Sequence, residues 1–153
     1  MSDIKIVSVM MRKGGVGKTL FSVLLAQYFG LNKTNGKRVL LMDMDSQQNA
    51  SVSLLKMESD PDLPEAFYPP IHPDYDAEEE GDEWEGRSST ADLFYGMPVV
   101  PYETRFPNLD ILPAAGEQLQ AVELVRSEEV KSKIYEQIRL FLDDPDLQSL
   151  YDM

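Results

Sequence analysis

Apolar residues gather in short runs near the N-terminus and recur at helical intervals further along the chain. Residues 4–10 are nearly continuously apolar, which predicts a parallel strand buried on both faces. Residues 38–45 form a second such run, ending in acids, and residues 108–114 form a third. After Lys18 the large apolar residues recur at helical spacing, so we expect a helix that ends near Gly30, with its aromatic residues in the core. This order predicts an α/β fold with a mostly parallel sheet.

Three shorter segments complete the pattern. Apolar residues at 52–57 predict a short buried helix, and Ser89–Gly96 reads as a helix with a capping residue at its start and glycine at its end. Residues 117–142 carry apolar side chains at helical intervals with a break at Ser127. We therefore expect two helices in that region.

Charge is distributed unevenly along the chain. The formal net charge is −13, but residues 1–56 are net positive, and residues 57–86 hold twelve acids and neither Lys nor Arg. Because prolines also cluster there, we expect residues 58–92 to form an acidic, Pro-rich surface insertion that is partly disordered. Solvation is its default role, and docking of a partner through its aromatic residues is the alternative. The single histidine, His72, is expected at the surface without a catalytic role.

Length and composition limit the classes of protein to which this chain can belong. At 153 residues the chain is long enough for one domain with a hydrophobic core. The sequence has neither a run of about eighteen apolar residues nor a signal peptide, which favours a cytoplasmic location without a membrane segment. It has no cysteine, which excludes disulfides and thiolate-bound metal sites, including iron–sulfur clusters.

The strongest chemical signal lies between the first predicted strand and the first predicted helix. It reads Met11-Arg12-Lys13-Gly14-Gly15-Val16-Gly17-Lys18-Thr19. Glycine lets the backbone curl so that several N–H groups point inward, and the helix N-terminus adds a partial positive charge, so the loop can hold a di- or triphosphate. Lys18 would reach the outer phosphates, and Thr19 would offer its hydroxyl to magnesium. An exposed glycine-rich turn is the alternative.

Two acids, Asp43 and Asp45, end the second predicted strand. Ligands of doubly wound sheets gather at the carboxyl ends of strands, which places both acids at the same edge as the glycine loop. If the strand continues to Asp45, the alternation of side chains points them the same way. A carboxylate there can orient a magnesium-bound or attacking water. Solvated acids at a strand end are the alternative.

The pattern K-G-G-x-G-K-[ST] at Lys13–Thr19 is a deviant Walker A motif, and it resembles that of the ParA/MinD family of partition ATPases. The run Asp43-Met44-Asp45-Ser46-Gln47-Gln48-Asn49-Ala50-Ser51 is similar to the family's second motif, D-x-D-P-Q-G-N-A-[ST]. Ser46 and Gln48 stand where Pro and Gly are usual. Loss of that glycine alters the backbone angles open to the loop, so nucleotide binding is the firmer expectation and hydrolysis the weaker one.

The resemblance implies a P-loop NTPase-like three-layer sandwich, of which residues 1–153 form the N-terminal part, incomplete at the C-terminus. It implies ATP and Mg2+ as cofactors, Asp45 and Lys13 as catalytic residues, and Thr19 with Asp43, the latter through water, at the metal. In this family the extra lysine, here Lys13, reaches the partner's phosphates across a nucleotide-sandwich dimer. The implied nucleotide-binding set is Lys13, Gly14, Gly15, Val16, Gly17, Lys18, Thr19 and Leu20.

The function implied by the resemblance is plasmid or chromosome partitioning by an ATP-bound homodimer that a ParB-like protein stimulates. In family members a pair like Tyr151-Asp152 introduces an apolar strand that ends in the Walker B acid and lies beside the phosphate-loop strand. Nonspecific DNA binding, and with it nucleoid association, belongs to C-terminal parts beyond that strand. Three alternatives stay open: a non-hydrolysing nucleotide-binding regulator that assembles with a full-length relative, a truncated inactive product, and a MinD-like membrane-positioning role.

Overall fold

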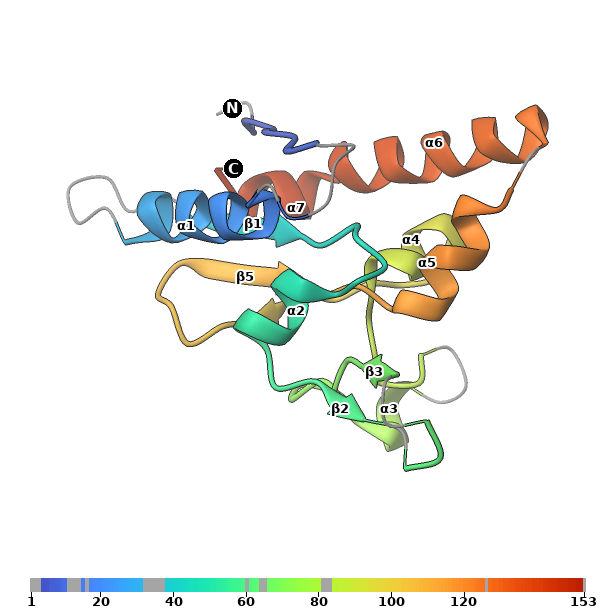
Figure 1. Ribbon diagram of the computed structural model, residues 1–153, viewed down its shortest axis with the longest axis horizontal. Helices are drawn as coiled ribbons and strands as arrows, with labels where there is room; N and C mark the ends of the chain where they lie inside the picture. Colours follow the sequence, from blue (N-terminus) through green and yellow to red (C-terminus); the bar gives the residue numbers. More distant parts are fainter. Residues whose placement is uncertain are drawn as a thin grey trace.

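The computed structural model describes residues 4–10, 15, 17–31, 38–59, 61–63, 66–80, 84–125 and 127–152 (Figure 1). Lys13, Gly14 and Val16, which the sequence analysis assigned to the nucleotide site, lie outside the described residues. The helices are α1 (Lys18–Gly30), α2 (Asn49–Leu54), α3 (Ala77–Glu80), α4 (Thr90–Tyr95), α5 (Gly116–Glu123), α6 (Glu128–Leu142) and α7 (Pro145–Leu150). The strands are β1 (Val39–Met42), β2 (Glu58–Ser59), β3 (Phe67–Tyr68), β4 (Tyr102–Glu103) and β5 (Leu109–Leu112).

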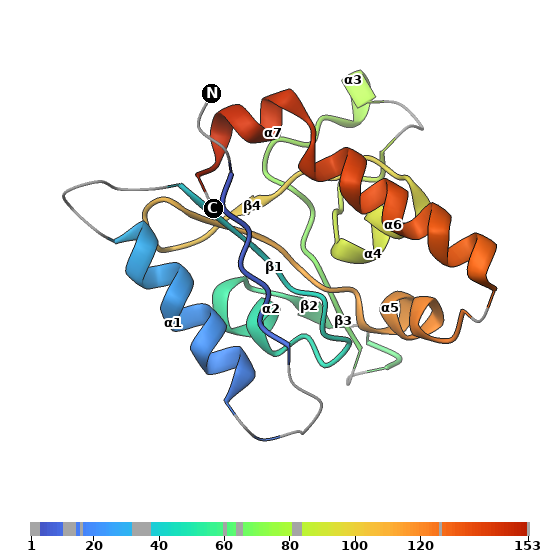
Figure 2. The same ribbon diagram turned by 90° about the horizontal axis from the view of Figure 1, so that it is seen from above.

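A three-stranded sheet in the order β1-β5-β4 lies at the centre of the fold. β1 and β5 pair in parallel, with Val39 opposite Leu109 and Met42 opposite Leu112, and β4 pairs antiparallel on the other side of β5. Figure 2 shows α1 on one side of this sheet and α6 with α7 on the other. The predicted α/β class is confirmed, the expected parallel pairing holds for β1 and β5, and the antiparallel strand β4 was not predicted.

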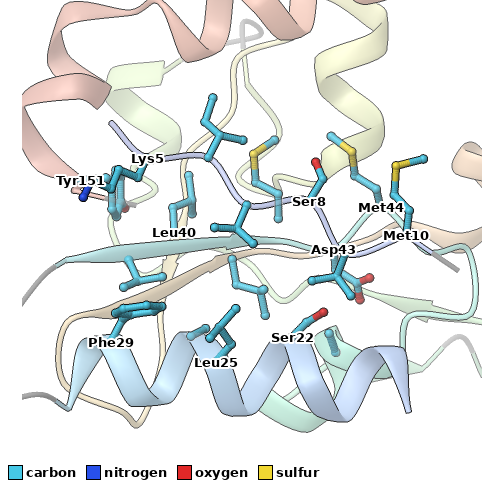
Figure 3. A pocket seen from close by; sticks show the side chains of 18 of the residues that line it. Lys5, Ser8, Met10, Ser22, Leu25, Phe29, Leu40, Asp43, Met44 and Tyr151 are labelled. Atoms are coloured by element: carbon cyan, nitrogen blue, oxygen red, sulfur yellow. The ribbon is translucent and has the colours of Figure 1, made fainter. Parts of the chain in front are cut away.

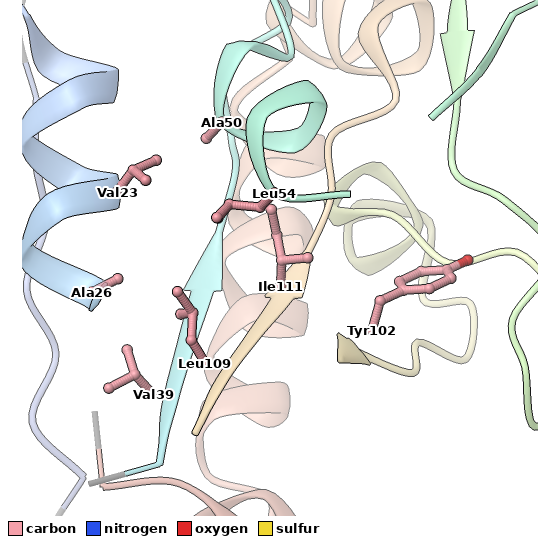
Figure 4. Packing of buried hydrophobic residues seen from close by; sticks show 8 residues of the cluster. All are labelled: Val23, Ala26, Val39, Ala50, Leu54, Tyr102, Leu109 and Ile111. Atoms are coloured by element: carbon pink, nitrogen blue, oxygen red, sulfur yellow. The ribbon is translucent and has the colours of Figure 1, made fainter. Parts of the chain in front are cut away.

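The main hydrophobic core lies between α1, α2 and the sheet (Figure 4). Small side chains on α1 let this helix lie close to the strands, and the residues at the centre of β5 are fully buried. Each buried aliphatic side chain contributes about 1.5–3 kcal/mol to folding, so this contact fixes α1 against β1 and β5. The core residues are Val23, Ala26, Val39, Ala50, Leu54, Tyr102, Leu109 and Ile111.

Helix α1 begins and ends where the sequence predicts, but it turns a different side to the core. Val23, Ala26 and Gly30 are buried, whereas Phe21 and Tyr28 are 55% and 67% exposed. The prediction that the aromatic residues of this helix lie in the core is wrong for these two. The close approach at Gly30 gives the physical reason, because a Cβ there would lie 3.1 Å from the backbone carbonyl oxygen at position 107, which leaves no room for a large side chain.

Helices α4, α5 and α6 lie close to the positions that the sequence predicts, whereas α2 and α7 differ from the prediction. Ser89 forms a capping box at the start of α4, and Gly96 ends it in the left-handed conformation. Ser127 is the residue that precedes α6, as predicted from the break in the pattern. Helix α2 starts earlier than the expected 52–57 and ends at Leu54, and α7 was not predicted. No helix among the described residues is long and apolar enough to cross a membrane.

Residues 58–92 carry more packed structure than the sequence predicts. β2 and β3 pair antiparallel, and Trp84 is buried. His72 is also buried, with its ring centroid 4.8 Å from that of Tyr102. Its Nδ1 accepts the amide of Asp74, so Nε2 carries the proton and donates to a backbone carbonyl. The expectation of His72 at the surface is therefore wrong, because aromatic neighbours cover it; the role of this segment stays a prediction.

Residues 4–10 do not form the predicted strand. They run in the same direction as β1, with Lys5 toward one end and Met10 toward the other (Figure 3), but a cavity of about 600 Å³ lies between the two segments. Ile6 and Val7 are 65% and 53% exposed rather than buried on both faces. The physical reason is the lack of a bonded neighbour: among the described residues no backbone hydrogen bond joins residues 4–10 to β1, and a strand forms only where such bonds are made.

The edges of this cavity have the arrangement that one further strand would need. The amides of Val39 and Asp43 donate toward β5, so the alternation along a strand directs the backbone groups of Leu40 and Met42 into the cavity. Asp152 joins the two segments that flank the cavity: its amide donates to the carbonyl of Arg38, and its carbonyl accepts the amide of Lys5. This is where the resemblance places the strand that follows Tyr151-Asp152 in family members.

A buried carboxylate anchors the last described residues to the sheet. Asp110 of β5 accepts hydrogen bonds from the hydroxyl of Tyr151 at 2.7 Å and from Nε of Arg38 at 3.0 Å. The guanidinium of Arg38 also lies over the ring of Tyr151. Burial and the bond to Asp110 raise the pKa of Tyr151, so its hydroxyl keeps its proton and donates at neutral pH.

Five apolar residues such as Val-Ile-Val-Ile-Val, added after residue 153, are expected to fill the cavity and stabilise the fold. Each buried aliphatic side chain contributes about 1.5–3 kcal/mol and each ordered residue costs about 1.5 kcal/mol, so the free energy of unfolding should rise, by at most about 7 kcal/mol for five residues. Urea denaturation measures this change. The control is an extension of five Gly and Ser residues, and equal stability of the two extended chains would contradict the expectation.

Candidate functional site

An ion pair joins the two motifs that the sequence analysis singled out. Lys18 lies in the first turn of α1, and Asp45 follows the end of β1. Nζ of Lys18 lies 2.5 Å from Oδ2 of Asp45, and their side chains are 34% and 26% exposed. This hydrogen bond holds the pKa of the Asp45 carboxyl below its ordinary value. The structure therefore brings the two residues together, while their chemical roles stay predictions.

Asp45 is held in a tight turn. Its Oδ1 accepts the amide of Gln47 at 3.0 Å, and its backbone carbonyl accepts the amide of Gln48 at 2.9 Å. The two contacts fix one carboxylate oxygen and the backbone of the turn. The other oxygen, Oδ2, is left facing Lys18 at the start of α1.

Asp43 lies in a different environment from Asp45. Because β1 ends at Met42, the two acids do not continue one strand, and alternation does not point them the same way. Asp43 is 6% exposed, and its Oδ2 accepts both the amide and the hydroxyl of Ser51 at 2.9 and 2.7 Å. Its Oδ1 accepts the amide of Asp45. Three hydrogen bonds thus replace the water that this buried carboxylate has lost.

The start of α1 offers backbone donors. Gly17 precedes the helix with φ 82°, a conformation that glycine adopts without strain. The helical hydrogen bonds begin with the amide of Phe21, which donates to the Gly17 carbonyl, so the amides of residues 18–20 have no acceptor within the helix. The first turn carries no acid, and no side chain among the described residues caps it. Amides without a helical acceptor and the helix dipole together suit an anion.

The remaining predicted residues at this end of α1 have different positions. Gly15 also has a positive φ, of 72°. Thr19 lines the cavity beside β1 together with Lys18 and Asp45. The side chain of Leu20 is 64% exposed, so a contact with nucleotide would come from its backbone amide.

These residues fit a magnesium–nucleotide complex better than a bare metal ion. Among the described residues, no group of three or more His, Cys, Asp or Glu could hold a metal. Magnesium keeps several waters and is usually bound by one or two carboxylates together with phosphate oxygens. The hydroxyl of Thr19 and the nearby carboxylates of Asp43 and Asp45 are compatible with that kind of site. Asp43 would contact the metal through water, because its Oδ2 already accepts a hydrogen bond from the hydroxyl of Ser51.

Three polar residues around the acids were not predicted. The hydroxyl of Ser51 accepts the amide of Ala114 as well as donating to Asp43, and the Thr90 hydroxyl donates to the Asp43 carbonyl. The third is Gln48, whose carboxamide is buried. Ser51 and Gln48 both stand in the second motif, which could have indicated a role for them. The contacts of Gln48 and Thr90 depend on how distant segments pack.

Comparison with known proteins gives three findings. A family model described as an AAA domain matches residues 4–143. A putative replication protein A of Sinorhizobium fredii (strain NBRC 101917 / NGR234) is 33% identical over 111 residues, which cover 72% of this chain and 22% of that protein. The chain thus spans about a fifth of the length of this curated relative. A solved structure titled "Structure of pnob8 ParA" is 21% identical, with a TM-score of 0.45, over 86% of this chain and 39% of that one.

Lys18→Met should remove a pH-dependent part of the stability. The pKa of the Asp45 carboxyl is lower in the folded chain than its ordinary value of 3.8. The ion pair therefore stabilises the fold fully at pH values above 3.8, and this stabilisation is lost as the pH falls through the folded-state pKa. Because both side chains are partly exposed, we expect about 0.5–1 kcal/mol at pH 7. Urea denaturation at pH 7 and at about pH 2 measures the difference from the parent. Lys133→Met, on the surface of α6, is the control. A loss of stability in Lys18→Met that is as large at about pH 2 as at pH 7 would contradict the account.

Ser51→Ala should destabilise the chain through two broken hydrogen bonds. The change leaves the buried amide of Ala114 without this acceptor and removes one donor from Asp43. Loss of a partner for a buried polar group costs about 1–3 kcal/mol. Thermal and urea unfolding measure the effect, with Ser53→Ala, on the exposed side of the same helix, as the matched control. Equal stability of the two variants would show that the contacts of Ser51 are unimportant.

Proposed function

This chain belongs to the AAA-domain family, in its ParA/MinD-like branch, and from that premise we propose that it binds ATP with Mg2+ where α1 meets the end of β1. The observation that carries the proposal is the ion pair between Lys18 and Asp45. It brings the predicted phosphate-binding lysine next to the predicted hydrolysis-linked acid. Lys18 and Asp45 are 27 residues apart in the sequence, so their meeting depends on the fold.

Binding would use the donors at the start of α1. The amides of residues 18–20 have no helical acceptor and can donate to phosphate oxygens. Lys18 would turn from Asp45 to the phosphates, where a charge-assisted hydrogen bond replaces the one it leaves. The hydroxyl of Thr19 would face the metal. Thr19 and, through water, Asp43 would hold Mg2+, which when bound would supply charge neutralisation at the outer phosphates.

Departure of Lys18 would free one oxygen of Asp45 for chemistry. In the nucleotide-free chain Oδ2 of Asp45 is occupied by the ammonium of Lys18, while Oδ1 is held by the amide of Gln47. With Oδ2 free and Oδ1 still fixed, the carboxylate can accept a hydrogen bond from a water and orient it for attack on the outer phosphate. The ion pair thus acts as a resting contact that nucleotide would replace.

The wider function we propose is partitioning of a plasmid or chromosome by a cytoplasmic, nucleoid-associated ATPase. By the resemblance, Lys13 would contact the partner's phosphates in an ATP-bound homodimer, and a ParB-like protein would stimulate hydrolysis. These steps belong to a whole protein, and this chain spans about a fifth of its curated relative. A nucleotide-binding regulator that does not hydrolyse is the second candidate, favoured by Gln48 at a position where the related motif has glycine.

Titration calorimetry with ATP and Mg2+ tests the binding step. The parent chain should bind saturably, and Lys18→Ala should weaken binding about tenfold or more, because a hydrogen bond to a charged group contributes about 1.5–3 kcal/mol. Asp45→Ala should bind as tightly as the parent or more tightly, since it removes the competitor for Lys18. Lys56→Ala is the control for loss of one positive charge.

Turnover under the same conditions separates the two candidate functions. Phosphate release by the parent that is lost in Asp45→Ala supports the ATPase. Binding without phosphate release supports the regulator. Normal turnover in Asp45→Ala would contradict the proposed role of this acid, and failure of the parent to bind at millimolar ATP would contradict the proposal as a whole.

A further inference from the structure

Gln48 stands at a backbone position that suits glycine better than glutamine. It has φ 56° and ψ 21°, in the left-handed region, and it precedes the first residue of α2. Residues with a side chain rarely adopt this conformation, and they keep it only where surrounding contacts hold them there. The contacts of its side chain should therefore show what keeps Gln48 in place.

The carboxamide of Gln48 joins two parts of the fold. Nε2 donates to the carbonyl of Ala114, after β5, and to the carbonyl of Phe67 in β3, both at 2.8 Å. The residue is 6% exposed. The start of α5 closes around it, since a Cβ at Gly116 would lie 3.0 Å from Oε1 of Gln48. Both N–H groups of the amide are used, one toward the sheet and one toward the acidic segment.

The backbone of Gln48 connects these contacts to the candidate site. Its amide donates to the carbonyl of Asp45 and closes the turn in which the Gln47 amide holds the Asp45 carboxylate. One end of this turn is thus fixed by a side chain bound to β3 and to the end of β5. The other end presents Oδ2 of Asp45 to Lys18.

We propose that Gln48 is a positioning residue for Asp45, and that through Gln48 the acidic segment, residues 58–92, sets the geometry of the turn that presents Asp45. The consequence for hydrolysis rests on the proposed function, but the coupling itself is a property of the nucleotide-free chain. A glutamine that only stabilised the fold would affect all buried amides alike. A positioning glutamine affects the turn first.

Amide hydrogen exchange in the nucleotide-free chain tests the positioning role. Gln48→Gly keeps a residue that suits the backbone angles and removes the carboxamide, so exchange at residues 47 and 48 should rise about tenfold while the core strands keep their protection. Gln48→Glu, which keeps the length but loses the donor, should act in the same way. Gln47→Ala, at the exposed neighbour, is the control. Unchanged exchange at residues 47 and 48, or an equal loss throughout the chain, would overturn the proposal.

A double-mutant cycle tests the coupling to the acidic segment. Arg87 holds that segment together, since its guanidinium donates to the Pro69 carbonyl and pairs with Glu58. Arg87→Ala should raise exchange at residues 47 and 48 in the parent, and it should add little in Gln48→Gly, because the connection is already removed. Additive effects of the two changes would overturn the coupling.

Kinetics test the consequence for hydrolysis. Gln48→Glu, which loses the donor without restoring the glycine of the related motif, should lower kcat about fivefold or more while KM for ATP changes by less than about twofold, since Asp45 acts in the chemical step and Lys18 binds the phosphates. An unchanged kcat would overturn this consequence. If the parent chain binds ATP but shows no turnover, the ATPase function fails in favour of the regulator, and the exchange experiments alone decide on the role of Gln48.

Discussion

The buried carboxylate of Asp43 is the contact on which the candidate site depends. It lies where β1 ends, its amide donates to β5, and its oxygens accept hydrogen bonds from Ser51 of α2 and from the amide of Asp45. A carboxylate removed from water is tolerated only when such bonds replace its hydration, so strand end, helix and turn are held in one arrangement. Asp45 is presented to Lys18 as a result. The residue expected near the metal thus acts first as the structural centre of the site.

The cavity beside β1 is the second constraint. The candidate site lies toward one end of it, with Met10 and Asp43, and the anchored residue Tyr151 lies toward the other (Figure 3). Residues 4–10 lead into the glycine loop, whereas β1 leads to the two acids. The spacing of these two segments therefore sets how the phosphate-binding residues meet the carboxylates. Among the contacts described, Asp152 joins the two segments at one end of the cavity, and the ion pair of Lys18 and Asp45 joins α1 to the end of β1 at the other.

Much of this arrangement could be predicted from local sequence signals. The capping pattern at Ser89 and the break at Ser127 marked helix starts, and the two motifs indicated which residues would meet. The exposed, non-strand conformation of residues 4–10 could not be predicted in the same way, because an apolar run forms a strand only where a neighbour supplies hydrogen bonds. The face that α1 buries depends on the close approach at Gly30, and the buried position of His72 depends on distant aromatic residues. Gln48 was recognised as a departure from the motif, but its contacts come from segments far away in the sequence.

The central claim is that the junction of Lys18 and Asp45 holds nucleotide phosphates. NMR of the isotope-labelled chain, titrated with Mg2+ and a non-hydrolysable ATP analogue, tests it most directly. The account predicts saturable shifts centred on the amides of Gly17, Lys18 and Thr19 and on the side-chain carboxyl of Asp45, as Lys18 moves from that carboxyl to the phosphates. Saturable shifts confined to other parts of the chain, or none at millimolar analogue, would contradict it.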